Sequence, residues 1–476
     1  MAKVLVTGIN GFIGSHLAEL LLARGDEVVG LVRPTADLRS LGPLSDRYGD
    51  RLRLVVGDLR TGSGLAEAVR GVEVVYHLGA VVMGTSEDEF RGTIVEGTRK
   101  LLEAVVVERN PGFRRFLYTS SQAAAGPAPS PAPIDENAPR NPVSWYGKSK
   151  RDAEDVAMEF AGRGVPVTIV RPAAVYGERE TDISGGTFPE VRAGLRPRIG
   201  LPEKTVSFVY VGDLVRGIVE AAASPAALNR TYFLANPGTN TASEIVAAIA
   251  KAMGKRFGFP VFIPHAAVWL VAVVSEWLHA FTRTRPMVTR DKVRELRQTS
   301  WAVSPAAARR DFGWLAGTPL DEGMRAAVAD WELRQQQAGR IAAEAPRDRA
   351  IKTFTLAVLL GIVVEGLAYL AGWYVYTSRW LIVVAMFGFF GVVIGLIAYL
   401  LAGRAATAQF AAGAAAFLAV EIPNQLWLQL WHFSPALLGN QDPWVRAGVL
   451  AVPVGLAPLA INGAIGLLYR VRLRLG

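Results

Sequence analysis

Short apolar runs alternate with longer amphipathic segments through about the first 175 residues of the chain. The short runs predict buried strands, and the segments in which apolar residues recur every three or four positions predict helices. Such alternation is typical of a parallel sheet with helices on both faces, the doubly wound α/β class. The predicted strands are 4–6, 27–32, 52–56, 74–78, 115–119 and 167–170, and the predicted helices are 12–23, 65–69, 89–108 and 145–162.

The pattern becomes irregular after residue 175, and residues 176–335 predict a smaller substrate-binding lobe that is interleaved with the first domain, residues 1–175. A proline-rich stretch at 127–142 predicts a loop beside the site, and the polar stretch at 336–352 predicts a linker. Within the lobe the predicted strands are 206–209 and 231–234, and the predicted helices are 212–223 and 242–253.

Residues 353–476 predict a third unit, an all-α transmembrane bundle of four helices. Each apolar segment exceeds the ~20 residues that a helix needs to cross a hydrocarbon core of about 30 Å. Four crossings return the chain to its starting side, and the basic residues before the first span and after the last one favour the cytoplasm. We therefore expect an integral membrane protein with a cytoplasmic α/β domain and both termini inside. The predicted spans are 354–376, 380–402, 405–431 and 446–469.

Composition and charge refine this picture in two ways. The chain of 476 residues carries a formal net charge of +9. Many of its arginines lie beside the apolar segments, so we expect a membrane surface and not nucleic acid as the partner. Cysteine is absent from the sequence, which excludes disulfides, thiolate metal sites and cysteine nucleophiles. No metal site is predicted.

The stretch KVLVTGINGFIG at residues 3–14 joins a predicted strand to a predicted helix through a glycine turn. Gly8, Gly11 and Gly14 would let the backbone approach a pyrophosphate closely, and the N-terminus of the following helix presents N–H groups and a partial positive charge. A glycine triplet alone is a weak signal, but this one opens an alternating strand and helix pattern. The stretch therefore predicts a dinucleotide site.

Tyr146 and Lys150 lie four residues apart on a predicted helix, so they share one face. A free tyrosine has a pKa near 10, and a neighbouring ammonium stabilises the phenolate and lowers that value. Ser120 and Ser121 end a predicted strand, where a hydroxyl could hold a substrate alcohol or carbonyl. The pair and the serines together predict acid–base chemistry beside the nucleotide.

These stretches make residues 1–335 similar to the extended short-chain dehydrogenase/reductase family, the group of NAD(P)-dependent epimerases, dehydratases and 3β-hydroxysteroid dehydrogenases. The resemblance implies a catalytic triad of Ser121, Tyr146 and Lys150, with Ser120 as the less suited serine. It also implies a homodimer, as in many relatives. The stretches that carry it are TGINGFIG (7–14), GDL (57–59), HLGA (77–80), YTSS (118–121), YGKSK (146–150) and RPAAVYG (171–177).

The resemblance further implies where the cofactor lies. Asp58 and Leu59 would flank the adenine, Leu78 and Ala80 would lie along the cofactor, and Pro172 and Val175 would border the nicotinamide. Lys150 would hydrogen-bond the ribose. The full set of expected cofactor-binding residues is Gly8, Gly11, Phe12, Ile13, Gly14, Arg33, Asp58, Leu59, Leu78, Ala80, Lys150, Pro172 and Val175.

The end of the second predicted strand bears on the choice between NADP and NAD. A site for NAD would place an acidic residue there to hold the ribose 2′-hydroxyl. This chain has Arg33 instead, with Arg39 shortly after it, and a guanidinium suits a 2′-phosphate. We therefore expect NADP(H), with NAD as the alternative if Arg33 only stacks on the adenine.

Three function classes remain open from the sequence. The first is an oxidoreductase acting on an alcohol or ketone of a sterol, isoprenoid or related lipid. The second is an epimerase of a nucleotide sugar or glycolipid with tightly bound NAD, in which Arg192, Arg196 and Arg198 could grip a diphosphate. The third is a nucleotide-sensing domain that regulates the membrane unit. Gln122 and two alanines stand where dehydratases carry an Asp-Glu pair, which argues against dehydration.

A strongly apolar stretch at residues 257–281 favours the lipid substrate. It is too short to span a bilayer, and its tryptophans could lie at headgroup depth beside the substrate lobe. The alternative is that the stretch packs as a core helix of that lobe.

Overall fold

The computed structural model describes residues 1–344, except 109–110, 181, 201, 256–257 and 283–287. The chain divides into two compact units, Met1–Gln336 and Gln337–Gly476, and the described structure is almost entirely that of the first. None of the helices formed by the described residues is both long and apolar enough to cross a membrane. The four predicted spans at 354–376, 380–402, 405–431 and 446–469 lie outside the described residues.

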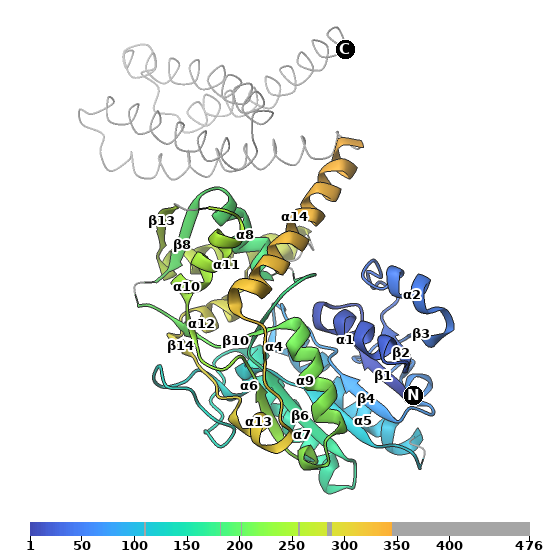
Figure 1. Ribbon diagram of the computed structural model, residues 1–476. Coiled ribbons are helices and arrows are strands. Elements are labelled where there is room, and N and C mark those ends of the chain that lie inside the picture. Colours follow the sequence, from blue (N-terminus) through green and yellow to red (C-terminus); the bar gives the residue numbers. More distant parts are fainter. Residues whose placement is uncertain (109–110, 181, 201, 256–257, 283–287, 345–476) are drawn as a thin grey trace, which may run out of the picture. The chain divides into compact units, whose positions relative to one another are not determined.

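A parallel sheet of seven strands forms the centre of the first unit (Figure 1). The strand order is β3-β2-β1-β4-β5-β6-β11, so the chain runs outward from β1 and then returns to β1's other side with β4. The doubly wound α/β class is thereby confirmed. The strands are β1 (Lys3–Thr7), β2 (Glu27–Val32), β3 (Leu52–Val56), β4 (Val74–His77), β5 (Arg115–Thr119), β6 (Val167–Pro172) and β11 (Thr231–Leu234).

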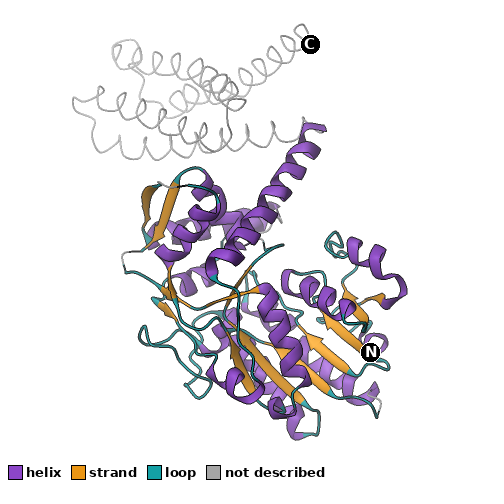
Figure 2. Ribbon diagram, in the orientation of Figure 1, coloured by secondary structure: helices purple, strands orange, loops and turns teal. Residues whose placement is uncertain are grey.

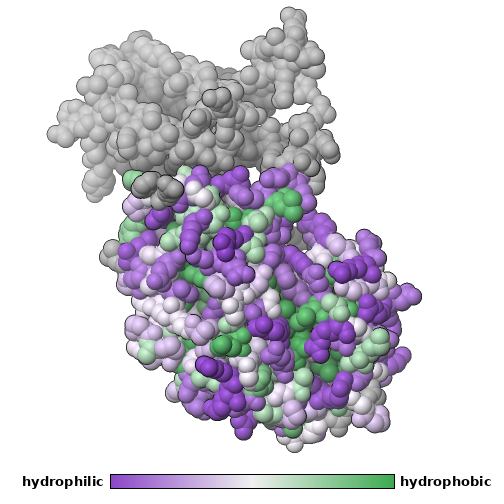
Figure 3. Space-filling view, in the orientation of Figure 1, coloured by the Kyte–Doolittle hydropathy of each residue, from purple (hydrophilic) through white to green (hydrophobic). Residues whose placement is uncertain are grey.

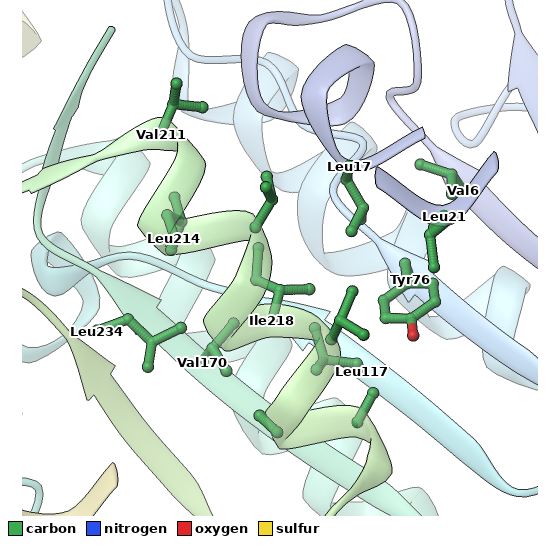
Figure 4. Close-up of a cluster of buried hydrophobic side chains, with 14 of the residues drawn as sticks. Val6, Leu17, Leu21, Tyr76, Leu117, Val170, Val211, Leu214, Ile218 and Leu234 are labelled. Atoms are coloured by element: carbon green, nitrogen blue, oxygen red, sulfur yellow. The ribbon is translucent and has the colours of Figure 1, made fainter. Parts of the chain in front are cut away.

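Helices cover both faces of the sheet. On one face α1 (Phe12–Ala23) and α9 (Val211–Ala223) pack in one apolar cluster with Val4 and Val6 of β1. Figure 4 shows α1 and α9 meeting over the sheet through leucine and isoleucine side chains. On the other face α3 (Leu65–Val69), α5 (Glu96–Glu108) and α7 (Trp145–Gly162) pack against Leu5 and its neighbours. Burial on both faces explains why the strands are continuous apolar runs.

Two predicted elements of the main domain differ from the structure. The predicted helix at 89–108 consists of α4 (Glu87–Phe90), a π-helical turn η2 (Arg91–Val95) and α5, because a 3.6-residue period does not reveal one extra residue in a turn. The segments 212–223 and 231–234 were assigned to the lobe, but α9 packs on the main sheet and β11 pairs with β6. Sequence order alone could not place them, since the lobe is inserted around them.

The remaining segments form a smaller lobe around its own core of Phe188, Ile249, Met324 and Trp331. Figures 1 and 2 show its helices and short strands grouped away from β1–β3. Its elements are β7 (Ala174–Tyr176), α8 (Asp182–Arg192), β8 (Leu195–Ile199), β9 (Thr205–Val206), β10 (Phe208–Tyr210), β12 (Asn240–Thr241), α10 (Ala242–Ala252), β13 (Phe259–Ile263), α11 (His265–Thr282), α12 (Arg290–Leu296), β14 (Ser300–Trp301) and α14 (Leu320–Glu344).

Short elements complete the first unit. They are α2 (Gly42–Tyr48), η1 (Gly49–Arg51), α6 (Gln122–Ala125), η3 (Pro225–Ala227) and α13 (Ala306–Phe312). The proline-rich stretch at 127–142 is a loop, as expected, and it is tied down along its length. Ala128 N donates to Ser300 O at 3.0 Å and Ile134 N donates to Ala302 O at 3.0 Å.

The apolar stretch at 257–281 contributes β13 and α11, and many of its large side chains lie at the surface. Seven of them are between 45% and 71% exposed, whereas Ala272 is buried. The interpretation of this stretch as a core helix is therefore wrong. Figure 3 shows hydrophilic and hydrophobic residues interspersed on the face that it draws, and the surface of β13 and α11 carries the seven exposed apolar side chains. We call it the apolar face: Phe259, Phe262, Trp269, Leu270, Val271, Val274 and Trp277.

Candidate active site

The glycine turn follows the carboxyl end of β1, beside the carboxyl end of the neighbouring strand β4. Gly8 has a φ of 69°, and Gly11 N donates to Gly8 O at 3.0 Å. A Cβ on Gly14 would stand 2.1 Å from Gly8 O, so only glycine fits there. The helix that follows has Gly11 at its N-cap and no side-chain cap. Its first N–H groups therefore suit a pyrophosphate, and the residues present fit a dinucleotide.

A chain of polar side chains beneath the turn connects β1 with β4. Leu78 N and Gly79 N donate to Thr7 Oγ1, at 3.2 and 2.9 Å. Thr7 Oγ1 lies 2.7 Å from His77 Nδ1, and His77 Nε2 lies 2.9 Å from Thr98 Oγ1. Thr98 Oγ1 donates to Ile94 O at 2.5 Å. All three side chains are buried.

Only one arrangement of protons satisfies this chain. Thr98 gives its proton to Ile94 O, so it must accept from His77 Nε2. His77 Nδ1 must then accept the proton of Thr7, whose oxygen accepts the two backbone N–H groups. The imidazole is thus neutral, in agreement with burial, which lowers the pKa of His77 to about 3. Sequence analysis missed this role of Thr7, His77 and Thr98, although the first two lie at the edges of the quoted stretches.

Tyr146 and Lys150 are brought together on α7, beside the carboxyl end of β5. Lys150 Nζ donates to Thr119 O at 2.8 Å and lies 5.9 Å from the centre of the Tyr146 ring. The Tyr146 ring packs edge-on against Phe90, with the ring centres 6.2 Å apart. Burial lowers the pKa of Lys150 to about 7, and the nearby charge of Glu154 opposes that shift. The ammonium is therefore close to its titration point at neutral pH.

The two serines at the end of β5 have different surroundings. Ser120 is buried, and its Oγ donates to Glu154 Oε1 at 2.6 Å. Ser121 is the N-cap of α6, where its Oγ accepts from Ala123 N at 3.1 Å. That contact uses an acceptor site and leaves the hydroxyl proton of Ser121 for a substrate oxygen. The geometry therefore supports Ser121 as the substrate-facing serine, and its catalytic role stays a prediction.

Glu154 is a buried charge that sequence analysis did not single out. Arg171 Nε and Nη2 donate to its two oxygens at 2.8 and 2.7 Å, and Arg140 Nη1 lies 3.4 Å from Oε2. Glu154 follows Lys150 by one helical turn, on the buried side of α7. The sequence does contain a sign of this role, because Glu154 is an acidic residue at a position of α7 where the amphipathic pattern calls for an apolar one.

Apart from the glycine turn and Lys150 of α7, the expected cofactor-binding residues lie at or near the ends of parallel strands. Arg33 follows β2 and is exposed, and among the described residues it forms no salt bridge. Arg39, by contrast, pairs with Asp37, whose oxygen lies 2.9 Å from its Nε. The others follow β3, β4 and β6: Asp58 and Leu59, Leu78 and Ala80, and Pro172, with Val175 in β7.

Two of the three arginines considered for a diphosphate have carboxylate partners. Arg192 Nη1 lies 3.7 Å from Glu332 Oε1, and Arg198 Nη2 lies 3.6 Å from Glu203 Oε2. Both ion pairs are partly exposed. Their charges are thereby partly compensated, which weakens the case for a diphosphate grip. Among the described residues there is also no group of three or more His, Asp or Glu side chains that could hold a metal ion.

The sequence of this chain is similar to those of known proteins. Residues 4–235 match the NAD dependent epimerase/dehydratase family. The chain is 27% identical over 331 residues to the 3-beta-hydroxysteroid dehydrogenase of Mycolicibacterium neoaurum, covering 66% of this chain and 87% of that protein. It is 26% identical over 330 residues to the N-acetyl-alpha-D-glucosaminyl-diphospho-ditrans,octacis-undecaprenol 4-epimerase of Escherichia coli O157:H7, covering 68% of this chain and 93% of that protein.

A solved structure shares the fold. The crystal structure of DesIV, a dTDP-glucose 4,6-dehydratase from Streptomyces venezuelae with NAD and TYD bound, has a TM-score of 0.58 and 23% sequence identity to this chain. The similarity covers 70% of this chain and 98% of DesIV.

The different surroundings of the two serines lead to opposite expectations for their alanine variants. Ser120→Ala removes a buried hydrogen bond to a carboxylate and should lower the free energy of unfolding by about 1.5–3 kcal/mol. Turnover of the folded fraction should fall much less than in Ser121→Ala, because Arg171 still holds both oxygens of Glu154. Ser121→Ala should lower kcat by ~10²-fold, as loss of one donor to a reacting oxygen does. Chemical denaturation and steady-state kinetics on both variants check this. The reverse pattern would assign the substrate oxygen to Ser120.

Proposed function

We propose that the chain is an oxidoreductase for a lipid-like alcohol or ketone. The match of residues 4–235 to the NAD dependent epimerase/dehydratase family supports an NAD-dependent oxidoreductase or epimerase. The substrate would be a sterol, an isoprenoid or a related lipid. Hydride would pass between the nicotinamide and the carbinol or carbonyl carbon. The observation that carries this proposal is the apolar face on the lobe that is expected to bind the substrate.

The side chains of the site suit the proton half of such a reaction. Tyr146 would take the proton of the alcohol in oxidation and return it in reduction. A protonated Lys150 favours the phenolate of Tyr146, because opposite charges stabilise each other, and Ser121 would orient the substrate oxygen. The bound nicotinamide supplies the hydride acceptor or donor. The contact of Lys150 Nζ with Thr119 O keeps the ammonium on the Tyr146 side of α7.

The apolar face supports a lipid-like substrate for a physical reason. Monomeric soluble proteins rarely expose large contiguous apolar patches, and such patches mark interaction sites. In this chain the exposed side chains include two tryptophans and two phenylalanines on α11 and β13. The relatives named above agree only partly, since one acts on a hydroxysteroid and the other on a sugar that is linked to undecaprenol. A hydroxysteroid and an undecaprenol-linked sugar both contain a large apolar portion.

The substrate class is tested by supplying two probes to the purified full-length chain. Cholesterol in detergent micelles with NADP⁺ should give absorbance at 340 nm, because oxidation leaves reduced cofactor in solution. Tyr146→Phe should lower that rate by 10²–10⁴-fold, roughly the contribution of general acid–base catalysis. Tyr48→Phe, a change of the same kind on α2, serves as the control and should keep full activity.

The same assay separates the alternatives. UDP-glucose that is converted to its epimer without net reduction of cofactor would replace the proposal with the epimerase. If the unaltered chain converted neither cholesterol nor UDP-glucose, and Tyr146→Phe left its affinity for the nucleotide unchanged, the nucleotide-sensing alternative would be favoured.

We further propose that the cofactor is NADP(H). Arg33 at the end of β2 is exposed and has no salt-bridge partner among the described residues, so its guanidinium is available for a 2′-phosphate. A charged hydrogen bond is worth about 1.5–3 kcal/mol, and KM for NADPH should accordingly be lower than KM for NADH by ~10-fold or more. Arg33→Ala should remove most of the difference. Arg39→Ala, which disrupts a pair with Asp37, should change it less. Equal KM values in the unaltered chain would contradict the proposal.

We also propose that the chain acts at a membrane, with the α/β domain and both termini in the cytoplasm. The support comes from the apolar segments of residues 353–476 and from the apolar face. In the sequence, basic pairs at 255–256 and at 283 and 285 bracket that face, and basic residues beside aromatic ones suit a surface of anionic lipid. A homodimer remains an expectation from the family resemblance alone.

Docking of the apolar face on lipid can be measured because the chain has no cysteine. A fluorescent maleimide attached to Leu270→Cys should be quenched by brominated phosphatidylcholine in vesicles that contain phosphatidylglycerol. Val107→Cys carries the same label on α5, where Val107 is 79% exposed, and it should show little quenching. Equal quenching at the two positions would sink the proposed docking, whatever the other residues of the chain do in the vesicle.

A further inference from the structure

The first turn of α7, which carries Tyr146, is held by carboxylates from a distant helix of the lobe. Trp145 N donates to Asp291 Oδ1 at 2.7 Å, and Tyr146 N donates to Asp291 Oδ2 at 3.3 Å. Ser144, the N-cap, accepts from Gly147 N at 2.9 Å and donates to Glu295 Oε1 at 2.6 Å. The leading N–H groups of α7, which a helix leaves without partners of its own, are therefore satisfied largely by α12.

This arrangement costs more than an ordinary helix cap. Asp291 and Glu295 are both buried, and burial raises the pKa of Asp291, with the charge of Glu295 adding to the effect. α7 already has a local cap in Ser144, as α10 has in the capping box of Thr241 and Glu244, and Asp291 binds two further N–H groups, those of Trp145 and Tyr146. The N-terminal end of α7 carries a partial positive charge that offsets part of this cost. Burying two neighbouring carboxylates indicates a function beyond capping.

The element that supplies the carboxylates is itself tied to the apolar face. Arg290 N and Nε donate to the carboxylate of Glu276 at 2.7 and 2.6 Å, which joins α12 to α11. Arg294 lies 4.9 Å from the centre of the Trp145 ring and 3.4 Å from Asp291 Oδ1. Tyr146 is thus bonded to the lobe through its amide, while Lys150 one turn later is bonded to β5.

We propose that Asp291, assisted by Glu295, is a positioning residue that sets the place of Tyr146 in the site from the substrate lobe. The proposal rests on the proposed function only in taking Tyr146 as the acid–base group, which an epimerase would share. Asp291 touches the backbone of the catalytic turn and not the reacting atoms. Its effect is therefore on the geometry of proton transfer, where a displacement of about 1 Å can cost 10²-fold in rate.

Asp291→Asn tests this on the full-length chain. The amide has one acceptor oxygen where the carboxylate has two, and it carries no charge, so Tyr146 should lose its fixed position. We expect kcat to fall by ~10- to 100-fold, while the KM values of substrate and cofactor change less than twofold. Glu244→Ala breaks the capping box of α10 and is the matched control. The control should lower thermal stability and leave kcat unchanged. If Asp291 had only a structural role, Asp291→Asn would behave in the same way.

Glu295→Gln provides a second variant in case Asp291→Asn does not fold, because it leaves both bonds from Asp291 to the α7 backbone in place and weakens the bond from Ser144 and the ion pair with Lys292. It should lower kcat in the same direction by a smaller factor. If both folded variants keep kcat within twofold of the unaltered chain, the positioning role is refuted.

A measurement without substrate separates this proposal from the proposed function. Hydrogen–deuterium exchange of the peptide covering residues 144–147 should be faster in Asp291→Asn than in the unaltered chain, with NADPH affinity by fluorescence titration unchanged. Unaltered exchange there would overturn the proposal even if cholesterol is oxidised. Faster exchange in a chain that instead epimerises UDP-glucose would leave the proposal standing, with kcat then measured on that reaction.

Discussion

The buried ammonium of Lys150 is the interaction on which the site depends. An isolated buried charge is costly, and this one is held by the carbonyl of Thr119 and by the field of Glu154. Glu154 in turn is fixed by Arg171 and Ser120. Removing one member of a buried ion pair costs about 3–5 kcal/mol, so the chemistry of α7 and the stability of the β5–β6 region rest on the same group of side chains. The pKa of Lys150 near 7 is the balance of burial against that field.

A second buried polar chain does the corresponding work for the cofactor turn. The turn after β1 must hold a left-handed Gly8 against Gly79, with backbone atoms about 3.0 Å from where a Cβ would stand. Thr7 Oγ1 accepts hydrogen bonds from the backbone N–H groups that follow β4, and its hydroxyl donates a hydrogen bond to the neutral His77. The side chains of Thr7, His77 and Thr98 all have hydrogen-bond partners. A polar network that is fully satisfied makes a core more rigid, whereas one that is only half satisfied weakens it. The two networks place the nucleotide turn and the Tyr–Lys pair on one edge of one sheet.

What the sequence could predict was what is local along the chain. The glycine turn, the Tyr–Lys spacing and the strand ends are contiguous patterns, and the doubly wound class followed from their alternation. The roles of His77, Glu154, Asp291 and Glu295 depend on partners up to 151 positions away, which no window of sequence contains. For the same reason, the sequence pattern assigned the segments of β11 and α9 to the substrate lobe, although both belong to the main domain. The apolar stretch that became α11 could be recognised as apolar, but its exposure depends on what packs beside it.

The position of α12 decides how the lobe and the sheet can act together. Consecutive residues bond to different neighbours: Arg290 to Glu276 on α11, and Asp291 to the first turn of α7. A short helix of seven residues with both contacts at one end leaves little room to move one neighbour without the other. Substrate binding to the lobe could therefore help to hold Tyr146 in place. Such an effect raises kcat only if the position of Tyr146 suits the transition state better than the ground state. Under the proposed roles of Tyr146 and Asp291, the lobe would take part in catalysis as well as in substrate binding.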